Sequence, residues 1–411
     1  MNGELCPDDP DPAAGQRPPS PSWGGGGGGG PTAVQRGASP PTLSLPRKGG
    51  REAHTILARL ARLAVLLAFF ATPALPQGFA DMGAPAKGFA LPDRATVLTF
   101  PQDHGPHPDF RIEWWYLTAN LEGPDGTPYG LQWTLFRTAL APGDSGGWES
   151  SQLWMGHAAV TTSETHLVAE RLARGGVGQA GVTVGGEAPF RAWIDDWQML
   201  SGAPPDRDAL SALTLSAKGP GFGYKVALTA EGPLVLQGDR GYSVKSAGGQ
   251  ASYYYSQPFY RVTGVLDLPD GPVAVTGQAW LDREWSSQPL AADQTGWDWF
   301  SLSFDTGEKL MGFVLRDAGE GFTSGTWISA DGTPAPLEPG ALRAEPLRWT
   351  DVAGRSVPVD WRLTLPGRGL DVRLTALNPK AWMATSVPYW EGPVTISGSH
   401  AGRGYLEMTG Y

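Results

Sequence analysis

The sequence predicts an all-β protein with two antiparallel β-barrels in tandem, and three observations favour this fold class. The chain of 411 residues contains 57 glycines and 38 prolines, which is too many turn-forming residues for a helical bundle or a coiled coil. Apolar and polar residues alternate with a period of two along many short segments, as is typical of half-buried strands. Two motifs also recur in the same order, which indicates two related halves.

Four turn motifs predict hairpins between alternating segments. They occupy residues 123–126, 269–272, 305–307 and 366–369, and each contains glycine. Glycine adopts positive φ at little cost, so turns of this kind reverse a strand readily. We therefore expect each motif to join two antiparallel neighbours.

The internal repeat predicts the number of barrels. Residues 115–137 resemble residues 299–316, and residues 192–197 resemble residues 279–285. The chain after position 80 divides into halves of about 165 residues, the size of a closed barrel that holds one small ligand. A single large β-sandwich is the alternative.

We expect four segments along the chain. Residues 1–46 are rich in proline, glycine and serine with few apolar clusters, and are predicted to form a disordered low-complexity extension. Residues 47–80 pass from basic to apolar to small residues, which is the layout of a signal peptide. The two barrel domains then comprise residues 81–255 and 256–411.

The apolar part of the signal-like segment is short. Residues 63–70 are about half of the ~20 residues that span a bilayer, so no stable transmembrane segment is expected after cleavage. We expect a periplasmic or secreted protein whose translation starts downstream of Met1. A disordered extension before an uncleaved anchor is the alternative.

The composition argues against several classes of function. The net charge of -10 and the lack of a Lys/Arg cluster exclude nucleic acid as an expected partner. The single cysteine, Cys6, falls in the extension, so we expect neither a disulfide nor a thiolate nucleophile in the mature chain. The serine-hydrolase elbow, the phosphate loop and the dinucleotide fingerprint are missing. No cofactor is expected.

The first candidate site is a carboxylate among aromatic residues at 113–116. On a strand, Glu113 and Trp115 share one face, and Trp114 and Tyr116 share the other. Glu113 is then either an acid whose pKa is raised by burial or a partner in a salt bridge at a barrel end, to Arg137 or Arg111.

Two histidines precede this cluster. His104 and His107 are separated by two residues and lie near acidic side chains, a spacing that can form a zinc or iron site. Neighbouring glycine and prolines indicate a loop, however, and histidines in a loop are more often turn or capping residues. We expect no metal, and these two residues are the candidates if one binds.

The second candidate site is a charged run between two indoles. Asp282 and Glu284 point to one side of an extended chain, and Arg283 and Trp285 point to the other. Two carboxylates in a partly dry cleft can differ in pKa and act as acid and base. A charge network at the junction of the halves, with Arg283 bidentate to a carboxylate, is the alternative.

Further aromatic residues predict a ligand pocket. Trp297, Trp299, Tyr389 and Trp390 lie near the second cluster or in the last part of the chain. Aromatic walls with few polar groups are typical of a pocket for an apolar ligand, although rings of this size also serve as core packing.

The motifs at 100–116, 279–287, 296–301, 389–392 and 404–411 together resemble the AttH-like family. This family includes the carotenoid 1,2-hydratases (hydroxyneurosporene synthases) and proteins described as secreted hydrolases. The resemblance spans nearly the whole mature chain. It implies two lipocalin-like (calycin) barrels, in agreement with the internal repeat.

One motif departs from the hydratases. They carry Asp-His-Asn-Trp where this chain has Asp282, Arg283, Glu284 and Trp285. An arginine cannot usefully release a proton, because its pKa exceeds about 12. The chain is therefore more similar to the secreted branch, which is linked with a macrolide-type exporter, and ABC transporter components are expected partners.

We expect an exported protein that binds an apolar small molecule of the isoprenoid or lipid type. The alternative is a hydratase-type lyase that protonates a terminal isoprenoid double bond and adds water. Asp282 or Glu284 would be the acid, Trp285 would stabilise the cation, and the second carboxylate would hold the water.

Overall fold

The computed structural model describes residues 87–411 except residue 289, and these residues belong to one unit. The extension predicted at 1–46 and the signal peptide predicted at 47–80 lie outside the described residues. A search of the described part of the chain finds no helix with the length and apolar character needed to cross a membrane.

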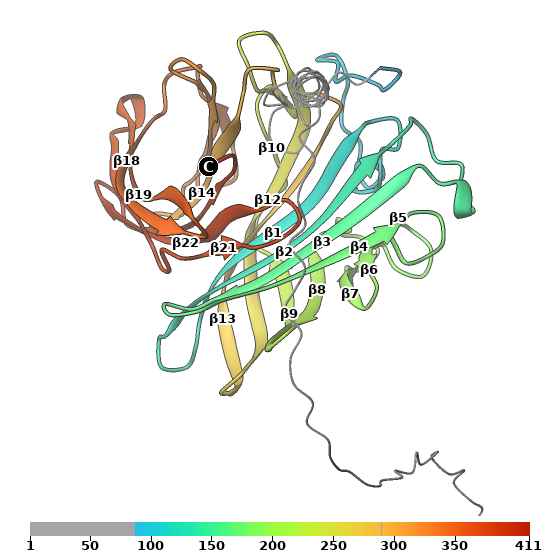
Figure 1. The fold of residues 1–411 in the computed structure, drawn as a ribbon, viewed down its shortest axis with the longest axis horizontal. Coiled ribbons are helices and arrows are strands. Elements are labelled where there is room, and N and C mark those ends of the chain that lie inside the picture. Colours follow the sequence, from blue (N-terminus) through green and yellow to red (C-terminus); the bar gives the residue numbers. More distant parts are fainter. Residues whose placement is uncertain (1–86, 289) are drawn as a thin grey trace, which may run out of the picture. The chain divides into compact units, whose positions relative to one another are not determined.

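Within the described residues, the first sheet has thirteen antiparallel strands (Figure 1). They are β1 (Ile112–Glu122), β2 (Pro128–Ala139), β3 (Gln152–Thr161), β4 (His166–Arg174), β5 (Ala180–Val184), β6 (Phe190–Ile194), β7 (Trp197–Ser201), β8 (Ala212–Gly219), β9 (Phe222–Ala230), β10 (Val235–Leu236), β11 (Tyr242–Val244), β12 (Ala251–Leu268) and β13 (Gly271–Ser286). Eleven of them follow the order β4-β3-β2-β1-β13-β12-β9-β8-β7-β6-β5 and form a nearly closed barrel, while β10 and β11 pair with β12.

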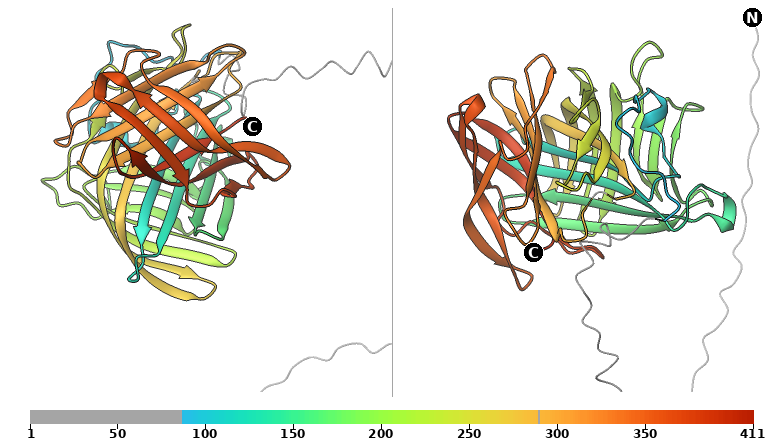
Figure 2. Two further views of the ribbon diagram at one scale, coloured as in Figure 1. Left: turned by 90° about the vertical axis from the view of Figure 1, so that its left-hand side faces the viewer. Right: turned by 90° about the horizontal axis from the view of Figure 1, so that it is seen from above.

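The second sheet has ten antiparallel strands among the described residues and curls into a half-barrel (Figure 2). They are β14 (Gly296–Phe304), β15 (Lys309–Arg316), β16 (Phe322–Ile328), β17 (Pro334–Pro336), β18 (Arg343–Val352), β19 (Arg355–Leu365), β20 (Leu370–Ala376), β21 (Trp382–Met383), β22 (Tyr389–Gly398) and β23 (Gly402–Met408). The helices among these residues are three short 3-10 turns, η2 (Gln102–His104), η3 (Gly147–Glu149) and η4 (Pro366–Arg368).

The all-β class and the tandem antiparallel arrangement are confirmed, with one difference in each half. The second sheet is a curled half-barrel rather than a closed barrel. The first sheet continues to Ser286, because the predicted hairpin at 269–272 joins two long strands, β12 and β13, that both belong to it. The expected boundary at 255/256 therefore falls inside β12, and the two sheets divide between Ser286 and Gly296.

The two sheets pack directly on each other through the outer face of β1, β2 and β13. Gly130 on β2 permits this approach, since a Cβ atom there would lie 2.7 Å from the ring of Pro393 and 2.8 Å from the Tyr405 hydroxyl. An ion pair of 2.7 Å between Arg403 on β23 and Glu122 on β1 also joins the two sheets at the surface. Overpacking at so close a contact would push the sheets apart.

Among the described residues, the three larger apolar clusters divide the interior. One fills the first barrel and one lies within the second sheet. The third lies between the sheets and includes Tyr116 and Trp280 from the first together with Trp299 and Phe313 from the second. This third cluster is continuous with the pocket described below.

Candidate functional site

Strand alternation sorts the candidate residues onto two faces of the first sheet. Tyr116 is opposite Asp282 in the β1–β13 ladder, and Trp114 is opposite Glu284, so these four side chains project outward. The residues between them, including Trp115 and Arg283, project into the barrel. The predicted facing of the 113–116 and 282–285 segments is therefore confirmed.

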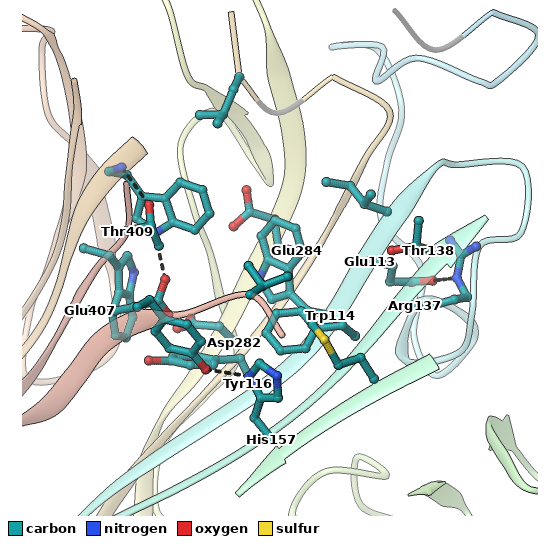
Figure 3. Close-up of a pocket in the computed structure, with 18 of the residues that line it drawn as sticks. Glu113, Trp114, Tyr116, Arg137, Thr138, His157, Asp282, Glu284, Glu407 and Thr409 are labelled. Carbon is teal, nitrogen blue, oxygen red and sulfur yellow. Dashed lines mark hydrogen bonds and ion pairs between the residues drawn. The ribbon is translucent and has the colours of Figure 1, made fainter. Parts of the chain in front are cut away.

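The outward residues line a pocket of about 360 Å³ between the two sheets (Figure 3). This volume lies within the usual range for small-molecule sites. Most of the lining is apolar. The aromatic lining residues are Trp114, Tyr116, Phe136, Trp154, Tyr254, Trp297, Trp299, Phe313 and Tyr389.

Asp282 is a buried carboxyl at the wall of this pocket. Its Oδ1 accepts hydrogen bonds from Ser256 Oγ at 2.5 Å and from Trp280 Nε1 at 2.8 Å. Its Oδ2 makes no hydrogen bond of normal geometry with any described residue. Burial raises the pKa of Asp282 to about 7, although hydrogen bonds with the side chains of Ser256, Trp280 and Tyr254 oppose this rise. The carboxyl is therefore partly protonated near neutral pH.

Glu407 is a second acid with the same property. Trp297 Nε1 donates a hydrogen bond of 2.8 Å to its Oε1. Burial raises its pKa to about 7, and the negative charge of Asp282 contributes to the rise. Glu391 is its cross-strand neighbour and accepts a hydrogen bond from the Tyr116 hydroxyl. Burial also raises the pKa of Glu391 well above its usual range, so acid groups on three strands hold protons.

A buried ion pair lies beside these acids. Lys245 Nζ is 2.9 Å from Glu284 Oε1, which also accepts a hydrogen bond of 2.5 Å from Ser252. The ammonium lies 3.8 Å from the ring centroid of Phe313. Burial lowers the pKa of Lys245, while the charge of Glu284 opposes this change. The pair brings no net charge to the pocket.

The inward face carries a different group of charges around Glu113. This carboxylate lies 2.9 Å from Arg137 Nε, 2.7 Å from Arg283 Nη2 and 2.6 Å from His107 Nδ1. Burial alone would raise the pKa of Glu113, but the charges of Arg283, His107 and Arg137 outweigh it and lower the pKa. Of the two alternatives for Glu113, the structure has the salt bridge to Arg137 and not the raised pKa.

Several predicted site residues belong to packed cores rather than to the pocket wall. Arg283 is fully buried, with its guanidinium 3.9 Å from the ring centroid of Trp115. Trp285 stacks on His107 with ring centroids 4.0 Å apart. Trp390 belongs to the apolar cluster of the second sheet. Trp115 likewise belongs to the core of the first barrel. By contrast, the pocket is lined by both carboxylates of the second cluster and by the remaining candidates, Glu113, Trp114, Tyr116, Trp297, Trp299 and Tyr389.

The two histidines at the start of the described chain are held by protein groups. His104 hydrogen-bonds the Tyr255 hydroxyl at 2.7 Å and Asp208 at 3.1 Å. His107 bridges Asp103 and Glu113. The described residues contain no group of three or more His, Cys, Asp or Glu side chains arranged to hold a metal ion.

Sequence reasoning missed several residues that line the pocket. Glu407 falls in the last family-like motif, but nothing in the sequence indicates that it meets Asp282. Lys245 lies just after β11, between two short polar stretches, and carries no sequence signal. His157, which hydrogen-bonds the Tyr389 hydroxyl at 3.0 Å across the two sheets, was also not assigned a role.

Comparisons with known proteins agree with this fold. The family model described as AttH-like matches residues 91–411. No functionally curated protein matches the chain. A solved structure assigned as an AttH from Nitrosomonas europaea is 34% identical, with a TM-score of 0.69, and the match covers 79% of this chain and 99% of that one.

Two further solved structures share the fold at low sequence identity. Kievitone hydratase from Nectria haematococca is 17% identical with a TM-score of 0.58, covering 78% of this chain and 98% of that one. CghA, solved with Sch210972, is 14% identical with a TM-score of 0.50, covering 81% of this chain and 97% of that one.

Proposed function

The chain belongs to the AttH-like family, and from this premise we propose that it binds a mainly apolar small molecule, of the isoprenoid or lipid type, in the pocket between its two sheets. The observation that carries the proposal is the aromatic lining, which nine rings from both sheets supply. Burial of apolar ligand surface against such walls contributes about 25 cal/mol for each Å².

Titration of the full chain with apolar ligands tests the proposal. Trp114, Trp297 and Trp299 line the pocket, so a bound ligand should quench tryptophan emission in a saturable way. The variant Trp299→Ala should weaken binding, and Trp390→Phe, in the core of the second sheet, is the matched control. Quenching that does not saturate, or that both variants reduce equally, would contradict the proposal.

A second candidate function is proton transfer to the ligand, as in a hydratase-type lyase. The observation that favours it is Asp282, a buried acid with a pKa of about 7 and one oxygen that makes no hydrogen bond of normal geometry among the described residues. The acid donates its proton to one carbon of a double bond, and water adds to the cationic carbon. That water returns a proton to the Asp282 carboxylate, which regenerates the acid.

Mass spectrometry of the ligand after incubation tests this second function. Lycopene or neurosporene should gain one molecule of water with the parent protein and none with Asp282→Asn. Because the neutral amide keeps the shape of the pocket, binding measured by quenching should persist in the variant. Equal turnover by the parent protein and Asp282→Asn would remove Asp282 from the reaction.

We also propose that the protein is periplasmic or secreted and acts with an ABC-type export system. The signal-like layout of residues 47–80 and the link of the resembling secreted branch with exporters support this proposal. Fractionation of cells that produce the full chain, with sequencing of the N-terminus of the exported protein, is the test. An uncleaved chain in the cytoplasm would contradict it.

A further inference from the structure

The carboxyl groups of the pocket lie together at the end formed by β13 and β23. Figure 3 shows Asp282, Glu284 and Glu407 on this side, away from Glu113 and Arg137. Glu284 has a cationic partner in Lys245. Among the described residues, Asp282 and Glu407 form no ion pair, so this end of the pocket can carry uncompensated negative charge.

The two acids differ in exposure, because Asp282 is buried whereas Glu407 is half-buried. Asp282 is 2% exposed, and its Oδ2 makes no hydrogen bond of normal geometry with any residue in the described chain. Glu407 accepts a hydrogen bond of 2.8 Å from Trp297 Nε1, and Tyr116 hydrogen-bonds the same carboxyl. Water has little access to the Asp282 carboxyl, so its negative charge is costly unless a cation lies beside it.

Aromatic rings surround the same end of the pocket. Tyr116 and Trp299 meet edge to face with centroids 5.3 Å apart, and both line the pocket beside Asp282 and Glu407. Tyr254 pairs with Glu284 across the β12–β13 ladder and also lines the pocket. Ring faces attract cations, most strongly where water is excluded.

We propose that the natural ligand is an amphiphilic cation, with its apolar body along the aromatic wall and one ammonium or other weakly hydrated cationic group beside Asp282 and Glu407. The inference rests on the proposed binding function and specifies the chemical class of the ligand. The cation takes the place of the protons that these carboxyls hold when the pocket is empty, so binding releases protons.

The charged groups around this position favour a cation over an anion. Asp282 and Glu284 on β13 and Glu407 on β23 face the position of the cationic group. Glu391, on β22, lies behind them and hydrogen-bonds Tyr116. Lys245 is already paired with Glu284. Arg111 and Arg137 line the pocket near the start of β1, where Glu113 compensates Arg137.

A set of three compounds with eight carbons in a row tests the proposal on the full chain. Octyltrimethylammonium carries a permanent charge, 1-octanol is neutral, and octanoate is an anion whose eighth carbon is the carboxylate. At pH 8 the cation should bind at least about tenfold more tightly than the alcohol, which corresponds to one cation–π contact of ordinary strength. Its advantage should shrink on acidification to pH 5, because the two carboxyls regain their protons.

Two variants and one control assign the effect to the pocket. Asp282→Asn and Glu407→Gln should each reduce, several-fold, the ratio of the affinity for the cation to the affinity for 1-octanol. Glu187→Gln removes the same charge from an exposed position outside the pocket lining and should change nothing. Circular dichroism establishes that each variant is folded before it is titrated.

The outcomes separate this inference from the proposed function. If the cation and the alcohol bind equally, or octanoate binds best, the cationic class is overturned and the apolar pocket stands. A cation preference that neither pocket variant reduces also overturns the inference, because it would reflect the acidic surface as a whole. If none of the three compounds binds, the proposed function fails as well.

Discussion

The two faces of the β1–β13 ladder hold buried carboxyl groups in opposite states. On the inward face, Glu113 lies within 3 Å of Arg137, Arg283 and His107, and its pKa is lowered. On the outward face, Asp282 is similarly buried but forms no ion pair with any described residue, since the nearby Lys245 is paired with Glu284, and the pKa of Asp282 is raised to about 7. The two side chains differ in the charges that surround them and not in their degree of burial.

This difference shows which face is suited to structure and which to chemistry. A carboxylate whose charge is fully matched fixes its neighbours and has no proton to exchange near neutral pH. A carboxyl whose charge is unmatched retains a proton and can release it to a ligand or in exchange for one. Burial in an aromatic environment is common to both, so the counter-charges decide.

The largest expected effect is a loss of stability on the inward face. Glu113→Gln leaves Arg283, Arg137 and His107 without their shared carboxylate, which should cost about 3–5 kcal/mol in the free energy of unfolding. Asp282→Asn replaces a largely neutral group at pH 6 and should change the free energy by less than about 1 kcal/mol. Urea denaturation at pH 6 measures the free energy of unfolding of both variants. If both lost the same amount, the proposed difference between the two faces would be wrong.

The second prediction concerns the pH dependence of stability. The folded pKa of Asp282 is about 7 and its ordinary value is 3.8, so the folded state binds the extra proton between these values. Stability from this group is complete below pH 4 and is lost as pH rises to about 7, by at most about 4 kcal/mol. Glu113 behaves oppositely, because its lowered pKa makes stability fall as pH drops below its ordinary value of 4.5.

Denaturation of the parent protein and two variants from pH 4 to pH 8 measures this effect. Asp282→Asn should flatten the decline toward pH 8, and the exposed control Glu187→Gln should follow the parent curve. Glu407, whose pKa is also about 7, retains part of the decline in the Asp282 variant. An unchanged slope in Asp282→Asn would show that its proton is not linked to folding.

The alternation of side chains along a strand made the assignment of residues to the two faces predictable from the sequence. It placed Asp282 and Glu284 on one face and Arg283 and Trp285 on the other, as the ladder with β1 confirms. The glycine-containing turns likewise predicted the hairpins. These features depend on neighbours along one strand or across one turn, where local geometry is set by residue type.

Contacts between residues that are far apart in the sequence could not be predicted from strand alternation or turn motifs. Glu407 approaches Asp282 only because β23 packs on the outer face of the first sheet, and Lys245 reaches the pocket from the segment after β11. The pairing of Glu113 with Arg283, within the first sheet, was also not predicted, although a salt bridge of Glu113 was one of the two alternatives. Arg283 is 170 residues away in sequence, and the alternation pattern does not report which charges meet across strands.

The smallest expected effect uses two adjacent tryptophans on opposite faces. Trp115 is fully buried in the barrel, donates a hydrogen bond of 2.9 Å to the His104 carbonyl and lies against Arg283. Trp115→Phe loses this bond and leaves a small cavity, so it should lower the free energy of unfolding by about 2 kcal/mol. Trp114→Phe changes a half-buried ring at the pocket and should cost less than about 1 kcal/mol.

Ligand titration completes this last comparison, because stability and binding should separate between the two positions. Trp114→Phe should weaken quenching by a bound ligand while the protein remains as stable as its parent. Trp115→Phe should keep the parent affinity under conditions where it is folded, since its ring does not line the pocket. If Trp115→Phe weakened binding more than Trp114→Phe, the ligand would lie inside the first barrel rather than between the sheets.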